Sequence, residues 1–139
     1  MVADGYSCHE TSFGVVAVKP YKGDFNWNEA WKKCSWDGKS DGKGELPAPR
    51  SSAENEWFVN KAKQLGLSNF WLGITDKGRE GTWTSQHNVP QGYFNWAAGE
   101  PNNQGNQDCA QAGGSWPGFS WDDDFCTKKI HLLCTYTGL

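Results

Sequence analysis

The hydrophobic positions along this chain change their period, and each change marks an element that we expect. Residues 14–18 (GVVAV) form a short β-branched run, which predicts a first strand. Trp27, Trp31 and Cys34 recur at i, i+4 and i+7, which is the spacing of one apolar helix face. Asp24 precedes this helix and has a side chain that suits an N-cap.

A second helix is predicted to begin near Ser51. The four residues from Ser51 to Glu54 match a capping box, in which the fourth position is acidic. Gly66 is a residue type that ends helices. The apolar face of this helix would consist of Phe58, Ala62 and Leu65.

Two later segments, residues 70–74 (FWLGI) and 130–136 (IHLLCTY), have the length and composition of strands. Residues 75–121 lie between them and are rich in Gly, Asn, Asp, Gln and Pro. A connection of this length in a compact domain is usually functional, and ordering it costs roughly 1–2 kcal/mol per residue. Helices early and strands late predict one α+β domain over residues 1–139.

Charge and cysteine content narrow the function classes. The formal net charge of −3, from 13 basic and 16 acidic residues, gives no electrostatic reason to expect nucleic-acid or anionic-membrane binding. Five cysteines occur without a CxxC pair, which speaks against zinc and thioredoxin-type sites and indicates an oxidising compartment. We therefore expect a secreted, extracellular protein without its leader, and residues 1–4 do not resemble a signal peptide. Spacing leaves the cysteine pairing open, with one cysteine over.

The long polar region contains many side-chain oxygens of the kind that bind calcium. Calcium takes six to eight oxygen ligands, whereas zinc prefers Cys and His. Any one of these residues could simply be solvated, since loops are generally polar, but their grouping favours a metal. The set is Asp76, Glu80, Glu100, Asn102, Asn103, Gln107, Asp108, Asp122, Asp123 and Asp124.

Three groupings within this set carry the interpretation. In residues 100–102 (EPN), an acid and an amide flank a proline and can point to one centre if the Glu100–Pro101 bond is cis. Gln107 and Asp108 directly precede a cysteine. Residues 122–124 are three adjacent carboxylates, whose mutual repulsion a divalent cation would remove.

These motifs, in this order, resemble the C-type lectin domain, and the resemblance extends over nearly the whole chain. Residues 71–74 (WLGI) look like the core strand signature of that family, and residues 100–102 (EPN) are its mannose-type tripeptide. Residues 121–123 (WDD) stand where the family usually has Trp-Asn-Asp ahead of a cysteine. The resemblance implies two helices flanking antiparallel sheets, with a long calcium-binding loop region. It is closest to mannose- and fucose-binding receptors and collectins.

The resemblance also implies the pairing of the cysteines. Cys34 would bond to Cys134, and Cys109 would bond to Cys126. Cys8 is then left over, and an interchain bridge through Cys8 is a hypothesis that would give a homodimer.

Two calcium sites follow from the resemblance. The ligands of the sugar-binding calcium would be Glu100, Asn102, Gln107, Asp122 and Asp123. The ligands of a second calcium would be Asp76, Glu80, Asn103 and Asp108. Gln107 stands where the family usually has Glu, and Asp122 where it has Asn, so the two exchanges cancel in charge. Asn106 is an alternative to Gln107, and the second site would be weaker without the shared glutamate.

The expected function is calcium-dependent binding of cell-surface or microbial glycans. Equatorial 3- and 4-hydroxyls of mannose, glucose or N-acetylglucosamine, with fucose as a further candidate, would coordinate the ion. Each hydroxyl would donate to Glu100 or Asp122 and accept from Asn102 or Gln107. One sugar would bind at about millimolar affinity, which is about −4 kcal/mol, so several linked sites would be useful.

Two other function classes compete with this interpretation. The first is a module of the same fold that binds protein or ice without sugar. The second is a glycosidase with paired carboxylates, which we do not expect because Asp122 and Asp123 lack an apolar setting that would raise a pKa. His9, His87 and His131 do not pair with a nucleophile, so we predict no enzyme, and His131 is expected to be an ordinary strand residue.

The nine tryptophans are expected to supply buried area more than sugar-stacking surfaces. Those expected in the core are Trp27, Trp31, Trp71, Trp83 and Trp121. Trp96 and Trp116 lie in the polar region and are left without a role.

Overall fold

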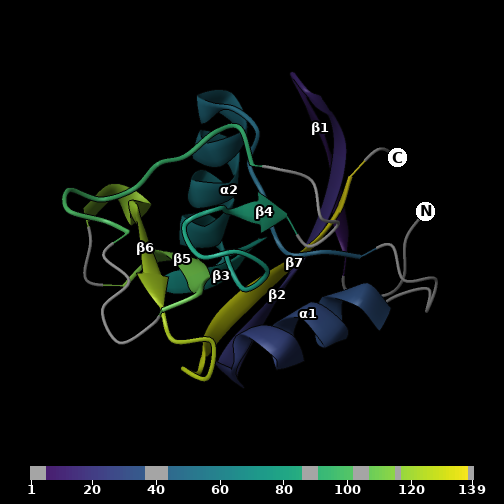
Figure 1. Ribbon diagram of the computed structural model, residues 1–139. Coiled ribbons are helices and arrows are strands. Elements are labelled where there is room, and N and C mark those ends of the chain that lie inside the picture. Colours follow the sequence, from purple (N-terminus) through teal and green to yellow (C-terminus); the bar gives the residue numbers. More distant parts are fainter. Residues whose placement is uncertain (1–5, 37–43, 86–90, 102–106, 115–116, 138–139) are drawn as a thin grey trace.

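The computed structural model describes residues 6–36, 44–85, 91–101, 107–114 and 117–137, and it is an α+β domain as predicted (Figure 1). The two helices are α1 (Trp27–Trp36) and α2 (Ser52–Gln64). The strands are β1 (Ser7–Thr11), β2 (Gly14–Phe25), β3 (Asn69–Thr75), β4 (Thr84–Ser85), β5 (Cys109–Gly113), β6 (Trp121–Asp124) and β7 (Ile130–Thr137). A short 3-10 turn occupies Pro117–Phe119.

The strands form two antiparallel sheets. One sheet has the order β1-β2-β7, in which the first and last parts of the chain lie side by side. The other has the order β4-β3-β5-β6. The apolar run at residues 14–18 predicted only the start of β2, which continues to Phe25 because Phe25 pairs with Ile130 on β7. β1 was not predicted, since its sequence SCHET carries no apolar pattern.

The two helices pack on different hydrophobic clusters, and the side chains of β3 alternate between them. Trp71 belongs to the cluster that holds Trp27 and Cys34 of α1. Its neighbours Phe70 and Leu72 belong to the cluster of α2. Successive side chains of a strand point to opposite faces, so this one strand connects both halves of the core.

The residue that caps α1 is not the predicted one. Asn26 is the N-cap: its Oδ1 accepts from the Glu29 backbone N–H at 2.8 Å. The Glu29 carboxylate accepts in return from the Asn26 N–H at 2.9 Å, which completes a capping box. The predicted cap, Asp24, lies inside β2 because that strand is longer than its apolar run.

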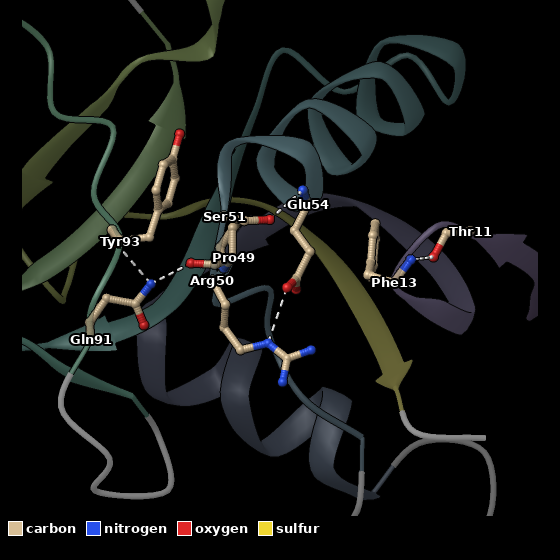
Figure 2. A network of polar contacts seen from close by, with 8 residues as sticks. All are labelled: Thr11, Phe13, Pro49, Arg50, Ser51, Glu54, Gln91 and Tyr93. Atoms are coloured by element: carbon tan, nitrogen blue, oxygen red, sulfur yellow. Dashed lines mark hydrogen bonds and ion pairs between the residues drawn. The ribbon is translucent and has the colours of Figure 1, made fainter.

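The start of α2 is as predicted. The hydroxyl of Ser51 accepts from the Glu54 N–H at 3.2 Å, and the Glu54 carboxylate lies 3.1 Å from Arg50 Nε (Figure 2). Figure 2 also shows the Gln91 amide, which donates to the carbonyls of Pro49 and Tyr93 and so ties the segment from residue 91 to the entry of this helix. Gly66, with φ of +77°, follows the last turn.

Both predicted disulfides are present. Cys34 of α1 is bonded to Cys134 of β7, and Cys109 at the start of β5 is bonded to Cys126 after β6. Cys8 on β1 is an exposed free thiol. The interchain bridge through Cys8 stays a prediction.

The polar region between residues 75 and 121 contains more regular structure than predicted. It includes β4 and β5, and Asp122 and Asp123 lie in a strand rather than in a loop. β5 reads CAQAG, a sequence of low β-propensity, and every one of its residues is buried. Pairing with β3 on one side and β6 on the other is what makes this segment a strand. No helix in the described segments is long and apolar enough to cross a membrane.

A buried hydrogen bond connects strand β6 to α2. The indole Nε1 of Trp121 donates to Asn55 Oδ1 at 3.1 Å, and both residues are buried. We expect Asn55→Ala to lower the free energy of unfolding by about 1–3 kcal/mol, because the buried indole N–H loses its acceptor. Urea denaturation measures this. Glu56→Ala, at the exposed neighbouring position, should change it little, and equal effects of the two substitutions would contradict the assignment.

Candidate metal and ligand site

Three strand ends bring the predicted site residues together. Thr75, the last residue of β3, pairs with Cys109, and Cys109 pairs with Asp124 of β6. Asp76 and Asp108 therefore follow and precede adjacent strands at one edge of the sheet. The Asp76 N–H donates to the Asp108 carbonyl at 3.1 Å, which fixes the two residues side by side.

Asp76, Glu80 and Asp108 form a carboxylate cluster. One oxygen from each residue lies within 4.8 Å of the others. Asp76 is only 3% exposed, Asp108 is partly buried and Glu80 is exposed. Asp76 Oδ2 accepts from the Gly81 N–H at 2.9 Å, which curls residues 77–81 over the cluster and brings Glu80 back to it. Local sequence therefore positions Glu80, and strand pairing positions Asp108.

The electrostatics of this cluster favour a cation. Burial raises the pKa of Asp76, and the nearby Glu80 raises it further, against the lowering effect of the Gly81 N–H. Burial also raises the pKa of Asp108, and Asp76 adds to that shift. Each of these two aspartates has a buried Oδ1 with no hydrogen-bond partner in the described part of the chain. A divalent cation with oxygen ligands would satisfy both atoms and offset the repulsion, so the residues fit calcium.

Glu100 lies in a turn that is attached to β6. The Ala97 N–H donates to the Trp121 carbonyl at 2.7 Å, and the Glu100 N–H donates to the Ala97 carbonyl at 2.9 Å. The Glu100–Pro101 peptide bond is cis, which is the geometry that the sequence-based prediction required for Glu100 and Asn102 to point to one centre. Asn102, Asn103 and Asn106 lie outside the described residues, as do His87 and Trp116.

The remaining predicted ligands lie on or beside β5 and β6. Gln107 is partly buried and directly precedes Asp108. On β6, Asp122 pairs with Gln111 and is partly buried, whereas Asp123 pairs with Ala110 and is 1% exposed. The structure thus places Asp122 and Asp123 directly after Trp121, the residue to which the Glu100 turn is attached.

Asp124 has a different role from its two neighbours. Its carboxylate accepts from Gln111 Nε2 at 2.6 Å and from Lys128 Nζ at 2.8 Å. It also accepts from the Phe125 N–H through Oδ1. These internal contacts anchor the end of β6, so Asp124 supports the strand. The sequence grouped it with the calcium-type oxygens, and nothing local distinguished it from Asp122.

The aromatic and histidine predictions are largely confirmed. Trp31 and Trp96 are partly buried, and Trp96 stacks on the exposed Phe94 at 5.8 Å between ring centroids. His131 accepts from the Gly23 N–H through Nδ1, which is a packing role within the sheet. The fully or nearly buried tryptophans are Trp27, Trp71, Trp83 and Trp121.

Sequence reasoning missed Lys77 and Asn55. Lys77 adjoins Asp76 and is close enough to Asp108 for their attraction to raise its pKa, although burial lowers that pKa more strongly. Asn55 holds Trp121 across the core. The only sequence signal for Lys77 was its position next to Asp76 after a predicted strand. No local sequence pattern indicated the role of Asn55.

Known relatives cover most of this chain. Residues 24–136 match the family model described as the Lectin C-type domain. A tetranectin-like protein from Carcharhinus perezii is 31% identical over 117 residues, which cover 83% of this chain and 67% of that protein. Pulmonary surfactant-associated protein D from Bos taurus is 31% identical over 126 residues, which cover 90% of this chain but only 32% of that protein. The chain therefore spans about a third of the surfactant protein.

Solved structures agree in fold. The C-type lectin CEL-I from Cucumaria echinata superposes with a TM-score of 0.80 at 22% identity, covering 95% of this chain and 94% of CEL-I. A herring type II antifreeze protein reaches 0.77 at 17% identity, covering 96% of this chain and 97% of that one. At these identities the likeness shows the fold alone. With residues 24–136 matched and the disulfides, helices and sheets in place, this chain belongs to the C-type lectin domain family, a non-enzymatic carbohydrate-binding fold.

Proposed function

We propose that this chain is a calcium-dependent lectin domain for mannose-type saccharides. The observation that carries the proposal is the cluster of Asp76, Glu80 and Asp108, whose carboxylate oxygens lie within 4.8 Å of one another. Asp76 and Asp108 each contribute a buried oxygen without a hydrogen-bond partner in the described residues. A cluster of this kind is unfavourable without a cation and favourable with one. It supports calcium binding where β3 ends and β5 begins.

The ligand sets are those implied by the family. The sugar-binding calcium would be held by Glu100, Asn102, Gln107, Asp122 and Asp123. The second calcium would be held by Asp76, Glu80, Asn103 and Asp108. Bound calcium supplies open coordination positions for two neighbouring hydroxyls of one sugar ring. The carboxylates of Glu100 and Asp122 would accept hydrogen bonds from the hydroxyls, and the amides of Asn102 and Gln107 would donate hydrogen bonds to them.

The selectivity of this site is set by hydroxyl geometry. A site of ordered donors and acceptors rejects isomers that leave its polar groups unpaired. We infer a preference for mannose, glucose and N-acetylglucosamine, with fucose as a further ligand. Gln107 and Asp122 exchange amide and carboxylate relative to the usual family pattern. The net charge of the ligand set is unchanged, but the hydrogen-bond donor and acceptor exchange positions. The order of affinity among these sugars is therefore expected to differ from that of family members with the usual pattern.

Calorimetric titration with methyl α-mannoside tests the proposal. In calcium we expect a dissociation constant of about 1 mM, and in chelator no measurable heat. Asp123→Asn, which removes one ligand charge, should weaken mannoside binding about tenfold or more, because a charge-assisted contact is lost. Asp24→Asn, at an exposed carboxylate on β2, is the matched control and should bind as the parent does.

A negative outcome has a definite meaning. Saturating calcium binding without heat from mannoside, glucoside or N-acetylglucosaminide would reject sugar recognition and leave a module of this fold that binds protein or ice. Secretion and recognition of cell-surface or microbial glycans belong to the same proposal.

A further inference from the structure

A pocket lies between α1 and the end of β3, and none of the predicted calcium ligands lines it. Its volume is about 330 Å³, within the range of roughly 300–1,000 Å³ that small-molecule sites occupy. Helix α1 supplies Trp27, Asn28 and Trp31, and the other lining residues are Thr75, Lys77, Gly78, Thr84 and Ser85.

The segment that leaves β3 contributes to both this pocket and the carboxylate cluster. Thr75 and Lys77 line the pocket, whereas Asp76 between them belongs to the cluster. Asp76 is buried and Lys77 is exposed, so the two neighbours serve different sites. The opposite wall is fixed, because Trp27 Nε1 donates to the Leu72 carbonyl at 2.8 Å in the core.

The walls of the pocket have the chemistry that recognises a sugar ring. Trp31 is partly buried and offers indole surface, whereas Trp27, one helical turn before it, is only 7% exposed. Around them lie the exposed amide of Asn28 and the hydroxyls of Thr75 and Thr84. A few polar groups around aromatic surface suit a molecule with one apolar face and a rim of hydroxyls.

Lys77 adds a positive charge to this pocket. Its Nζ lies 4.8 Å from the centroid of the Trp27 ring, in cation–π contact. The ammonium group has three donors and no acceptor, so it favours an anionic partner. Lys77 is exposed and lines the pocket, so its ammonium group is accessible to a ligand there.

We propose that the pocket between α1 and the end of β3 is a second ligand site, which takes a pyranose unit bearing a carboxylate or sulfate group. The ring lies against Trp31, and the acidic group meets Lys77. The nearby carboxylates of Asp76, Glu80 and Asp108 oppose an anion while they carry no ion. Calcium at that cluster removes this opposition, and in this respect alone the inference rests on the proposed function.

Nuclear magnetic resonance of the indole N–H groups tests the site directly. The probes are methyl β-glucuronide and glucose 6-sulfate, with methyl β-glucoside as the neutral reference, in calcium and with excess methyl mannoside. We expect saturable shifts of the Trp31 indole with either acidic probe and about tenfold weaker binding of the neutral glucoside. A response to only one acidic probe identifies the anion that the site prefers.

Two variants separate the charge from the fold. Lys77→Gln should weaken the acidic probes about tenfold and leave the neutral glucoside unchanged. Lys32→Gln, at an exposed lysine on α1 outside the lining, should change neither. The inference is overturned if neither acidic probe shifts Trp31 saturably, or if Lys77→Gln binds them as the parent does.

Chelator distinguishes this inference from the proposed function. Weaker binding of the acidic probes in chelator supports the link to the carboxylate cluster. Unchanged binding of the acidic probes in chelator would reject that link and keep the pocket. Saturable Trp31 shifts in a protein that does not bind mannoside would reject the sugar-binding proposal and keep the pocket. Mannoside binding without any response of Trp31 to the acidic probes would reject the second ligand site and keep the calcium proposal.

Discussion

Replacing both Cys34 and Cys134 by alanine is expected to lower the free energy of unfolding by about 4–5 kcal/mol. This disulfide joins residues that are 100 positions apart, so it removes more loop-closure entropy from the unfolded chain than a short-range bridge does. It also fixes α1 against β7, and both sulfur atoms are buried. Urea denaturation of parent and variant measures the change, in a Cys8→Ser background that prevents thiol exchange.

The second disulfide is the matched comparison. Cys109 and Cys126 are only 17 positions apart, and removing a loop closure of about this length is expected to cost about 3 kcal/mol. The double alanine variant at this pair should therefore unfold at a higher urea concentration than the variant at Cys34 and Cys134. The reverse order would contradict the loop-entropy argument and indicate that native-state packing around the binding strands decides.

Asp108→Asn is expected to have opposite effects with and without calcium. Because the pKa of Asp108 is raised, its charged form is disfavoured in the folded protein, so a neutral amide should raise the melting temperature in chelator. In calcium the parent should gain about 2.7 kcal/mol when the ion is present at about 100 times its dissociation constant. The variant should gain much less, since it has lost a ligand charge.

Thermal denaturation in the two buffers reports both effects. Glu10→Gln, at an exposed carboxylate on β1, is the control and should behave as the parent does in each buffer. If Asp108→Asn lowered the melting temperature in chelator, the carboxylate would be serving an internal contact, as Asp124 does with Gln111 and Lys128. An undiminished calcium effect in the variant would remove Asp108 from the ligand set.

The features that were predicted well depend on neighbours within one or two helical turns. Ser51 and Glu54 stand at capping-box spacing, and the structure has Ser51 as the N-cap. Trp27 and Cys34 lie on the buried face that their spacing predicts. The Asp24 cap was wrong because β2 extends through it, and a strand's length depends on the partner it pairs with.

For the site, too, the residue types could be predicted from the sequence, whereas their spatial grouping could not. Composition alone shows that the chain carries enough carboxylates and amides for calcium, and the family motifs assign them to two sites. That Asp76 and Asp108, 32 positions apart, share one cluster follows from the pairing of β3 with β5. The anchoring role of Asp124 likewise depends on Gln111 from the neighbouring strand.

The local sequence was therefore sufficient to predict the helices, the apolar strands and the types of metal-binding side chain, because those properties arise from short-range spacing and side-chain chemistry. The strand character of CAQAG, the meeting of Asp76 with Asp108 and the pocket beside Trp31 required the folded chain. Each of them is created by residues distant in sequence, and only packing and strand register bring such residues together.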